Sequence, residues 1–139
     1  MTSSVVSDLL KTKFCERDLA ERRKIACFGP PQPELSDLLQ PATVGTISFE
    51  RRFDLTLYAR FPWLTGCVTR SKLFCWPCLL YSSQQCKDNQ AWVRDGVNDL
   101  RRLAKLARDH ASTKSHMLTS LLLDRFIYHE IEGREVEGI

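Results

Sequence analysis

Apolar residues change their spacing several times along the chain, and each change predicts a different structural element. Residues 5–27 are rich in helix formers and predict one helix, with Ser7 as a candidate cap at its start. The stretch "FGPPQPEL" ends this helix, because its three prolines cannot continue helical hydrogen bonding. From there to about Ser48 the sequence predicts a loop with one short helical turn at "LSDLL".

Residues 49–61 have a mixed periodicity. Phe53, Leu55 and Leu57 alternate as in a strand, whereas Phe49, Phe53 and Leu57 share one face of a helix. We expect a helix over this segment, ended by the proline that follows it. The sequence "TGCVTRSKLFCWPCLLY" then predicts a β-hairpin with its turn at "TRSK". Its second strand is expected to continue as one apolar run through both cysteines of "FCWPC".

A second long helix is expected to begin at Asp95 or Gly96, after the polar segment "SSQQCKDNQ". Its apolar positions share one broad face, which is formed by Val97, Leu100, Leu103, Ala104 and Ala107. A row of basic side chains lines the opposite face, namely Arg94, Arg101, Lys105 and Arg108. His110 falls near the apolar side of this helix, and a weaker helical pattern follows it.

Four residues in these elements have the side chains of a zinc site. Cys75 and Cys78 form a Cys-x2-Cys pair, and a tight turn would point both sulfurs the same way. His110 and His116 would complete a tetrahedron of two sulfurs and two nitrogens. A continuous helix would place these histidines about 240° apart around its axis. We therefore expect the backbone to bend near Ser112 to Ser115.

The cysteine pair has two other interpretations. A redox pair of the thioredoxin type belongs at the start of a helix after a strand, which the continuous apolar pattern here does not predict. Packing in the core without a metal is the second alternative. The 31 residues between Cys78 and His110 exceed the spacer of a minimal zinc finger, so spacing favours zinc without excluding these alternatives.

We expect no metal or catalytic role for the third histidine and the tryptophans, and four of the six cysteines lack ligand spacing. Four cysteines lack ligand spacing and are expected to be free thiols: Cys15, Cys27, Cys67 and Cys86. Cys86 stands in a polar loop that can bring it toward the metal. His129 is expected to face solvent on a helix. The tryptophans that bracket the metal site are expected to be core residues rather than platforms for stacked bases: Trp63, Trp76 and Trp92.

These patterns predict an α+β fold in which Zn²⁺ stabilises a β-hairpin packed on helices. The chain is expected to divide into an N-terminal helical segment, a proline-containing loop, a zinc-binding domain and a helical, acidic tail, with bounds 1–30, 31–48, 49–122 and 123–139. A zinc ion with four protein ligands has no open position for water, so we expect no enzymatic activity.

Composition and charge narrow the class of protein. The chain of 139 residues is 43% hydrophobic, and it contains no signal-peptide pattern and no apolar run long enough to cross a membrane. Its cysteines are therefore expected in a reducing compartment. Between Arg70 and Leu118, nine lysines and arginines stand against four acidic residues, whereas from Thr119 onward two stand against five. The basic segment indicates either a polyanionic partner or a solvated helix face.

Three stretches of the sequence resemble the TTF-type zinc finger of hAT-superfamily transposases and of zinc finger MYM-type-like proteins. They are "FERRFDLTLYARFPWLTGC", "RSKLFCWPCLLYSS" and "WVRDGVNDLRRLAKLARDHASTKSH". With the upstream "FGPPQPEL" the resemblance covers roughly residues 20–122. Its most specific parts are the Phe-Cys-x2-Cys core, the aromatic-x-x-x-Gly entry to the helix and the His-x5-His end. The resemblance implies that the same four residues hold zinc, and that the protein has a nuclear role connected with nucleic acid.

The resemblance implies the DNA-binding domain of a hAT-type transposase, or of a protein derived from one, because the RNase H-like catalytic domain of these transposases lies downstream. Contacts to DNA would come from basic residues of the hairpin turn and the helix, namely Arg70, Lys72, Arg94, Arg101, Arg102, Lys105 and Arg108. The alternative is a protein-interaction module of a nuclear chromatin or transcription complex, in which these residues face solvent or bind an acidic partner. We expect no membrane partner and no small-molecule substrate.

Overall fold

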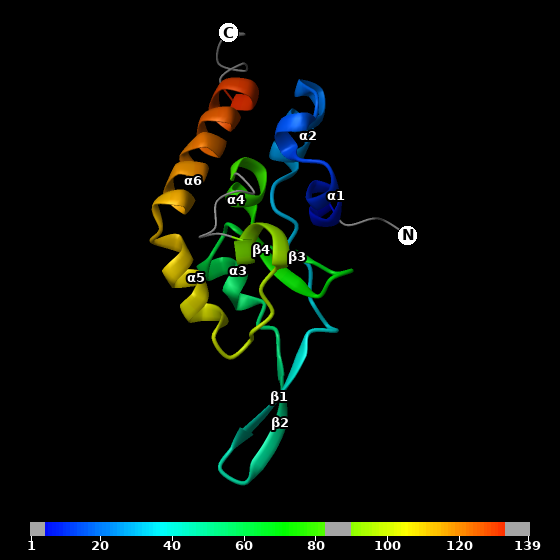
Figure 1. Cartoon of the computed structure of the whole chain (residues 1–139), viewed down its shortest axis with the longest axis vertical. Coiled ribbons are helices and arrows are strands. Elements are labelled where there is room, and N and C mark those ends of the chain that lie inside the picture. Colours follow the sequence, from blue (N-terminus) through cyan, green and yellow to red (C-terminus); the bar gives the residue numbers. More distant parts are fainter. Residues whose placement is uncertain (1–4, 83–89, 133–139) are drawn as a thin grey trace.

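Helices and two short antiparallel hairpins make up the described residues, which confirms the α+β part of the predicted fold. The computed structural model describes residues 5–82 and 90–132. In Figure 1 the helices occupy the upper part of the molecule, and one hairpin extends alone from the lower end. No helix within the described ranges is long and apolar enough to cross a membrane.

The N-terminal residues form two helices where the sequence predicts one. The elements are helix α1 (Val5–Lys11), the 3-10 turn η1 (Phe14–Glu16) and helix α2 (Leu19–Phe28). Asp18 begins α2, because its side chain accepts a hydrogen bond from the backbone N–H of Glu21 at 2.8 Å. Ser7 lies inside α1 instead of capping it. Because the whole region has high helix propensity, its pattern does not indicate that Asp18 caps a separate second helix.

The proline-rich segment packs against the core through its carbonyl groups. The Pro31 carbonyl accepts hydrogen bonds from the Gly66 N–H at 3.1 Å and from the Thr65 hydroxyl at 2.7 Å. The Pro33 carbonyl accepts from the Tyr58 hydroxyl at 2.7 Å. Proline has no N–H to donate, but its carbonyl remains an acceptor, so this segment supplies partners to buried polar groups.

A hairpin replaces the loop and the helix start that the sequence predicts around residue 48. Its strands are β1 (Leu39–Val44) and β2 (Ile47–Arg52). Gly45 has a φ of 62° in the two-residue turn, and β-branched residues stand on both sides of it. These local preferences outweigh the helical spacing of Phe49 and Phe53. The predicted boundary between residues 48 and 49 therefore falls inside β2.

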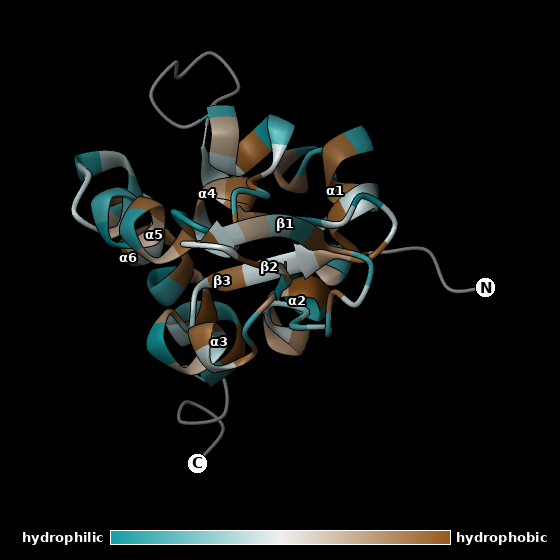
Figure 2. Ribbon diagram, turned by 90° about the horizontal axis from the view of Figure 1, so that it is seen from below, coloured by the Kyte–Doolittle hydropathy of each residue, from teal (hydrophilic) through white to brown (hydrophobic). Residues whose placement is uncertain are grey.

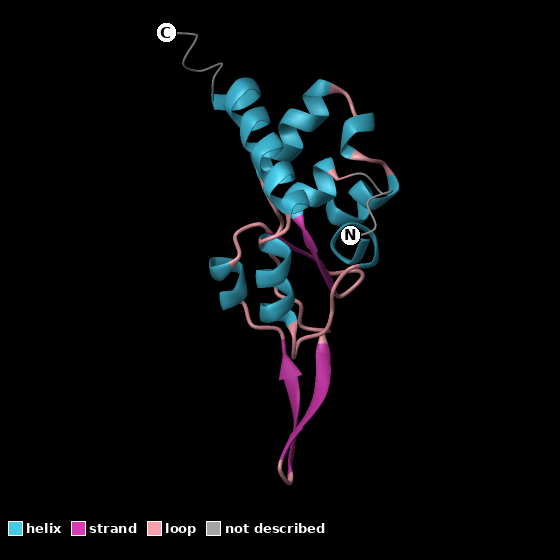
Figure 3. Cartoon of the chain, turned by 60° about the vertical axis from the view of Figure 1, so that its left-hand side comes forward, coloured by secondary structure: helices cyan, strands magenta, loops and turns pink. Residues whose placement is uncertain are grey.

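The predicted helix over residues 49–61 is correspondingly reduced to α3 (Thr56–Arg60). Just before this helix, the Asp54 carboxylate accepts hydrogen bonds from the N–H and hydroxyl of Thr56 at 2.9 and 2.7 Å, which form a local turn. At the base of the β1–β2 hairpin, the side-chain oxygen of Gln40 accepts from the Leu100 N–H at 2.7 Å. From this attachment the hairpin projects away from the helices (Figure 3).

The second hairpin agrees with the prediction from sequence, apart from its end. Strands β3 (Leu64–Cys67) and β4 (Lys72–Cys75) pair antiparallel, while Val68 lies exposed in the turn between them. Beyond Cys75 the apolar run does not continue as a strand but becomes helix α4 (Trp76–Tyr81). Pro77 lies in the first turn of α4, where its fixed φ and missing N–H favour a helix start.

The long helix predicted from Asp95 or Gly96 begins only at Leu103. The remaining helices are the single-turn π-helix η3 (Ala91–Asp95), α5 (Leu103–Ala111), α6 (Lys114–Ile127) and the π-helix η4 (Tyr128–Glu132). Between η3 and α5, Val97 exchanges backbone hydrogen bonds of 2.8 and 2.9 Å with Leu73 of β4. The backbone N–H and carbonyl of Val97 therefore bond to β4 and are not available for helical hydrogen bonds.

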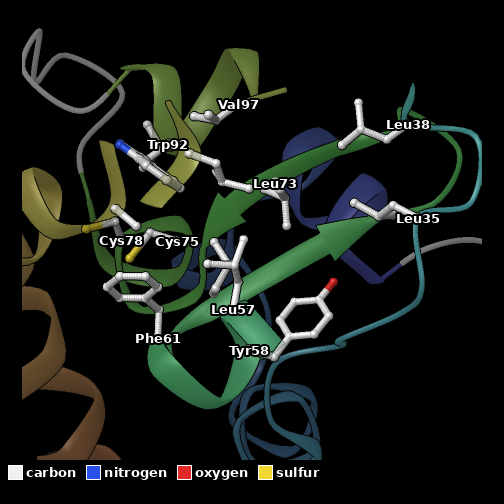
Figure 4. Close-up of a cluster of buried hydrophobic side chains, with 14 residues drawn as sticks. Leu35, Leu38, Leu57, Tyr58, Phe61, Leu73, Cys75, Cys78, Trp92 and Val97 are labelled. Carbon is white, nitrogen blue, oxygen red and sulfur yellow. The ribbon is translucent and has the colours of Figure 1, made fainter. Parts of the chain in front are cut away.

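Within the described ranges, most buried apolar side chains belong to two groups. The first lies around β3, β4, α3 and α5 and includes Leu57, Phe61, Leu73, Trp92 and Val97 (Figure 4). The second joins α1, α2, α4 and α6 and includes Leu9, Phe14, Trp76, Leu80 and Leu123. Seen from the hairpin end, α1 lies on the opposite side of the molecule from α5 and α6 (Figure 2), whereas α2 packs against α6 in this second group. The N-terminal segment is therefore packed on the rest of the fold, and α6 runs through the predicted boundary at residue 122.

Gly96→Ala tests how closely this residue approaches β4. An added β-carbon would lie 2.7 Å from Lys72 Cβ and 2.9 Å from Phe74 Cζ, at a φ of 80°. Gly29→Ala is the matched control, because Gly29 has a φ of 82° and no atom within 4 Å of the added carbon. The backbone conformation alone costs about 1–3 kcal/mol, and overpacking adds about 1–3 kcal/mol at residue 96 only. Urea unfolding should show this difference, and equal losses of unfolding free energy in the two variants would contradict the close contact.

Candidate metal centre

Four side chains from separate elements meet in the core, and they are the predicted set: Cys75, Cys78, His110 and His116. Their ligand atoms all lie within 4.8 Å of one another. Cys75 Sγ is 3.3 Å from His116 Nδ1, and Cys78 Sγ is 3.5 Å from His110 Nε2. A tetrahedral zinc ion with bonds of about 2.0–2.3 Å holds its ligand atoms roughly 3.3–3.8 Å apart. The group can therefore hold a metal ion with little movement.

The cysteines reach the site because the chain changes from strand to helix between them. Cys75 ends β4, and Cys78 lies in the first turn of α4. Residues three apart lie on one side of a helical turn, whereas they would point to opposite faces of a strand. The helix start, which Pro77 signals in the sequence, thus places both sulfurs on one side. Figure 4 shows them between Trp92 and Phe61.

The predicted bend between the two histidines is confirmed. Helix α5 ends at Ala111 and α6 begins at Lys114. Thr113 connects the two ligands at this bend: its hydroxyl donates to the His110 carbonyl at 2.8 Å and accepts from the His116 N–H at 3.2 Å. This helix cap fixes the backbone of one histidine relative to the other. A threonine just before a renewed apolar pattern is the sequence signal for such a cap, and sequence reasoning missed it here.

Hydroxyl groups next to the ligands orient their side chains. Ser120 Oγ lies 3.4 Å from Nε2 of His116, so Nδ1 of that ring is the nitrogen that faces Cys75. Thr119 Oγ1 lies 3.2 Å from Cys78 Sγ and donates to the His116 carbonyl at 3.1 Å. Partners of this kind fix the ring orientation and the coordinating nitrogen in metal sites. The spacing of residues in the sequence did not identify Ser120 or Thr119 as partners of the ligands.

Two indole rings close the site against water. The Trp63 ring lies 4.8 Å from that of His116, and the Trp92 ring stacks on that of His110 at 5.0 Å between centroids. The indoles meet each other edge to face at 5.5 Å. Both cysteines are 0% exposed, and the histidines only 4% and 7%. Trp92 is buried in the core as predicted, and the metal group has no open side toward solvent.

Burial and hydrogen bonding shift the pKa values of the two thiols in opposite directions. Burial raises the pKa of Cys75 well above the ordinary value of a thiol. The hydrogen bond with Cys75 lowers the pKa of Cys78, with further contributions from His110, His116 and Thr119. Cys78 is therefore the more easily ionised of the two thiols. When both cysteines ligate a metal as thiolates, a divalent ion would neutralise their two negative charges.

The local structure around Cys75 and Cys78 bears on whether they form a redox pair. Cys75 stands after a strand at the start of a helix, so the continuous strand expected through both cysteines was wrong. The strand before the helix belongs to the antiparallel hairpin β3–β4, whereas a thioredoxin-type pair belongs to a βαβ unit. In addition, both sulfurs are fully buried and each faces an imidazole, whereas reactive thiols are partly exposed. The geometry favours metal ligation over disulfide exchange.

The other cysteines and the third histidine lie outside the metal group. Cys15 and Cys27 are exposed, and Cys67 is buried in a separate apolar cluster. No disulfide links the cysteines within the described ranges. Cys86 lies outside the described residues. His129 is exposed on η4, as predicted.

The basic residues predicted to contact nucleic acid do not form one helical row. They are distributed over the β3–β4 hairpin (Arg70, Lys72), η3 (Arg94), the turn before α5 (Arg101, Arg102) and α5 itself (Lys105, Arg108). Three of them form ion pairs, Arg94–Asp95 at 2.9 Å, Arg102–Asp99 at 4.0 Å and Lys105–Asp109 at 2.8 Å. The Lys72 ammonium group donates to the Asp95 carbonyl at 3.0 Å. The predicted row is thus partly neutralised by acidic neighbours.

Comparisons with protein-family models, with curated proteins and with solved structures found no match for this chain. The resemblance to the TTF-type zinc finger therefore stays a prediction from sequence. Functional conclusions rest on the chemistry of the site and on the surface around it.

Thr113→Ala should weaken metal binding although Thr113 is not a ligand. Loss of the cap costs about 0.5–2 kcal/mol of folding free energy, and loss of ligand orientation typically lowers metal affinity by about 10–100-fold. Ser112→Ala is the control, because the Ser112 hydroxyl donates only to the Asp109 carbonyl, at 2.8 Å. Titration of Zn²⁺ against a competing chelator measures both variants. Wild-type affinity in Thr113→Ala would contradict this role, and Thr113→Ser should restore binding.

Proposed function

We propose that Cys75, Cys78, His110 and His116 bind Zn²⁺, and that this ion stabilises the fold. The convergence of four buried donors from β4, α4, α5 and α6 carries the proposal. Zinc suits a tetrahedral set of two thiolates and two imidazoles, and its charge matches that of the ligands. Its contribution is structural, because the bonds would join segments that are 41 residues apart in sequence.

We also propose that the chain is not an enzyme. Four protein ligands fill a tetrahedral zinc ion, which leaves no position for an activated water. The indole rings of Trp63 and Trp92 stand beside the histidines, where a substrate would have to approach. Both features support a structural site in which the ion organises the fold and carries out no reaction.

Zinc removal and ligand substitution test the structural role. We expect one zinc per chain by elemental analysis, and loss of cooperative unfolding when a chelator removes it, because zinc contributes on the order of 10 kcal/mol to the folding of small fingers. Cys78→Ala should abolish stoichiometric binding. Cys67→Ala is the control, since this cysteine is equally buried but outside the group, and it should retain the metal. A chain that contains no metal and unfolds cooperatively, with no effect of the chelator, would contradict the proposal.

We propose that this zinc-binding fold binds DNA, as a module of a hAT-type transposase or of a nuclear protein derived from one. The resemblance described above and the metal group at the same four residues support this function. The chain carries a net charge of +3, and several arginines are exposed outside the ion pairs. Exposed cationic side chains bind the phosphate backbone without needing a particular base sequence.

A zinc-stabilised protein-interaction module in a nuclear complex is the second candidate. Neighbouring apolar side chains on one side of α6 favour it, since Met117, Leu118 and Leu121 are 50%, 58% and 61% exposed. The ion pairs of Arg94, Arg102 and Lys105 favour it as well, because a paired cation is less available to phosphate. A protein partner would cover the α6 row.

Binding to random-sequence duplexes separates these two functions. If the chain binds DNA, log K should fall linearly with log salt, with a slope of about 0.9 for each phosphate contact. Leu118→Ser together with Leu121→Ser changes the α6 row and should leave duplex affinity unchanged. Absence of duplex binding at low salt by the zinc-loaded chain would contradict the DNA function, and the protein-interaction function would then be preferred.

A further inference from the structure

The outer part of the β1–β2 hairpin has an uncovered apolar face. The strand register places Val44 opposite Ile47, Ala42 opposite Phe49 and Gln40 opposite Arg51, so these six residues share one face. Val44, Ile47 and Phe49 are 65%, 67% and 42% exposed. A two-stranded hairpin buries little apolar surface by itself. The hairpin therefore presents an apolar row toward its tip and a cation at its base.

Four arginines surround two adjoining hollows at the base of this hairpin: Arg51 and Arg52 of β2, Arg60 of α3, and Arg101 of the turn before α5. The larger hollow, of about 670 Å³, runs along β1 from Gln40 to Val44. The smaller one, of about 200 Å³, reaches α3 and the start of α5. Both are lined by Arg51 and Arg101, so the two hollows form one basic surface, which we call the arginine cluster.

The arginine cluster is available to an anion. Within the described part of the chain, none of its four members has a carboxylate within 4.0 Å, in contrast to the ion-paired residues near α5. The two acidic residues in its lining have other partners: Asp54 accepts from Thr56, and Asp99 accepts from the Arg102 N–H and pairs with its guanidinium. Positive charge therefore exceeds negative charge at this surface.

Aromatic rings support two members of the cluster. The guanidinium of Arg51 lies 5.8 Å from the centroid of the Phe49 ring, and that of Arg60 lies 5.4 Å from the centroid of the Phe61 ring. Both distances are within the range of a cation–π contact, and guanidinium N–H groups can bind phosphate in a bidentate manner. These arginines are thus better placed for a phosphate backbone than mobile side chains would be.

We propose that the β1–β2 hairpin enters a groove of duplex DNA while the arginine cluster binds the phosphates beside that groove. This inference rests on the proposed DNA function and names the surface that performs it. Six residues at about 3.4 Å each make a ribbon about 20 Å long, and a two-stranded ribbon fits the major groove, which is about 12 Å wide. The apolar row at the tip would contact base edges and methyl groups, and the cations at the base would lie over the backbone.

The surface differs from the helix row that the sequence predicts, and the two can be compared directly. One variant of the full zinc-loaded chain carries three substitutions in the cluster, R51Q, R52Q and R60Q. The matched variant carries three near α5, R102Q, K105Q and R108Q. Arg101 stays unchanged, because it belongs to both sets. Fluorescence anisotropy with a labelled random-sequence duplex, measured over a range of salt concentrations, gives affinity and salt slope for each variant.

The cluster variant should bind all duplexes more weakly and should lower the salt slope by up to about 2.7, or about 0.9 for each lost phosphate contact. The α5 variant should lower it by less than about one third of that amount, because two of its three cations are already paired. Val44→Ser with Ile47→Ser should reduce affinity and leave the salt slope unchanged, since these residues carry no charge. Zinc content and circular dichroism report whether each variant is folded. If the cluster variant loses structure, R52Q with R60Q replaces it, because both of these side chains are exposed.

Three outcomes would overturn the proposal. If the wild-type chain binds no duplex, the DNA function fails and this surface fails with it. If the wild-type chain binds but only the α5 variant lowers the salt slope, the DNA function stands and the hairpin surface is wrong. If polyglutamate, used as an acidic-peptide probe, binds the cluster as tightly as duplex DNA does, an acidic protein is the better partner for this surface.

Discussion

The burial of four metal-ligand side chains in one place is the constraint that the rest of this structure has to satisfy. The sulfurs of Cys75 and Cys78 are fully buried, and the nitrogens of His110 and His116 lie within 4.8 Å of them. A cation bound between these atoms would neutralise the thiolates, and its bonds would connect β4 and α4 with the facing ends of α5 and α6. Because α4 and α6 also contribute to the second core group, the same bonds would help to hold the N-terminal helices in place.

The proposed DNA surface lies outside the metal group, but its geometry depends on it. Gln40 attaches the β1–β2 hairpin to Leu100, in the turn that leads into α5, and α5 carries His110 near its end. Arg101 stands in the same turn and lines both hollows of the arginine cluster. The proposed metal ligation would therefore fix α5, the element against which the hairpin is placed. This arrangement explains how a small core can hold a projecting ribbon and a basic surface in one orientation.

The sequence predicts the metal group well, because ligand chemistry restricts both residue type and spacing. The same reasoning predicts the bend at Thr113, since two ligands on one unbroken helix could not converge. Local helix preference predicts the wrong start for α5, because it does not include pairing between distant residues. Val97 pairs with Leu73, so α5 begins later than its apolar pattern indicates. The β1–β2 hairpin was missed because a two-residue turn at Gly45 outweighs the periodicity around it. The arginine cluster was missed because its members come from three elements that only the fold brings together.

The coordination sphere of the metal tests the central claim most directly. X-ray absorption at the zinc edge, on the purified chain, measures the number and type of ligands without disturbing the protein. We expect two sulfurs at about 2.3 Å and two imidazole nitrogens at about 2.0–2.1 Å, with no water bound. A coordinated water in place of one protein ligand, or a sphere with fewer than two sulfurs, would contradict a closed structural site formed by Cys75, Cys78, His110 and His116.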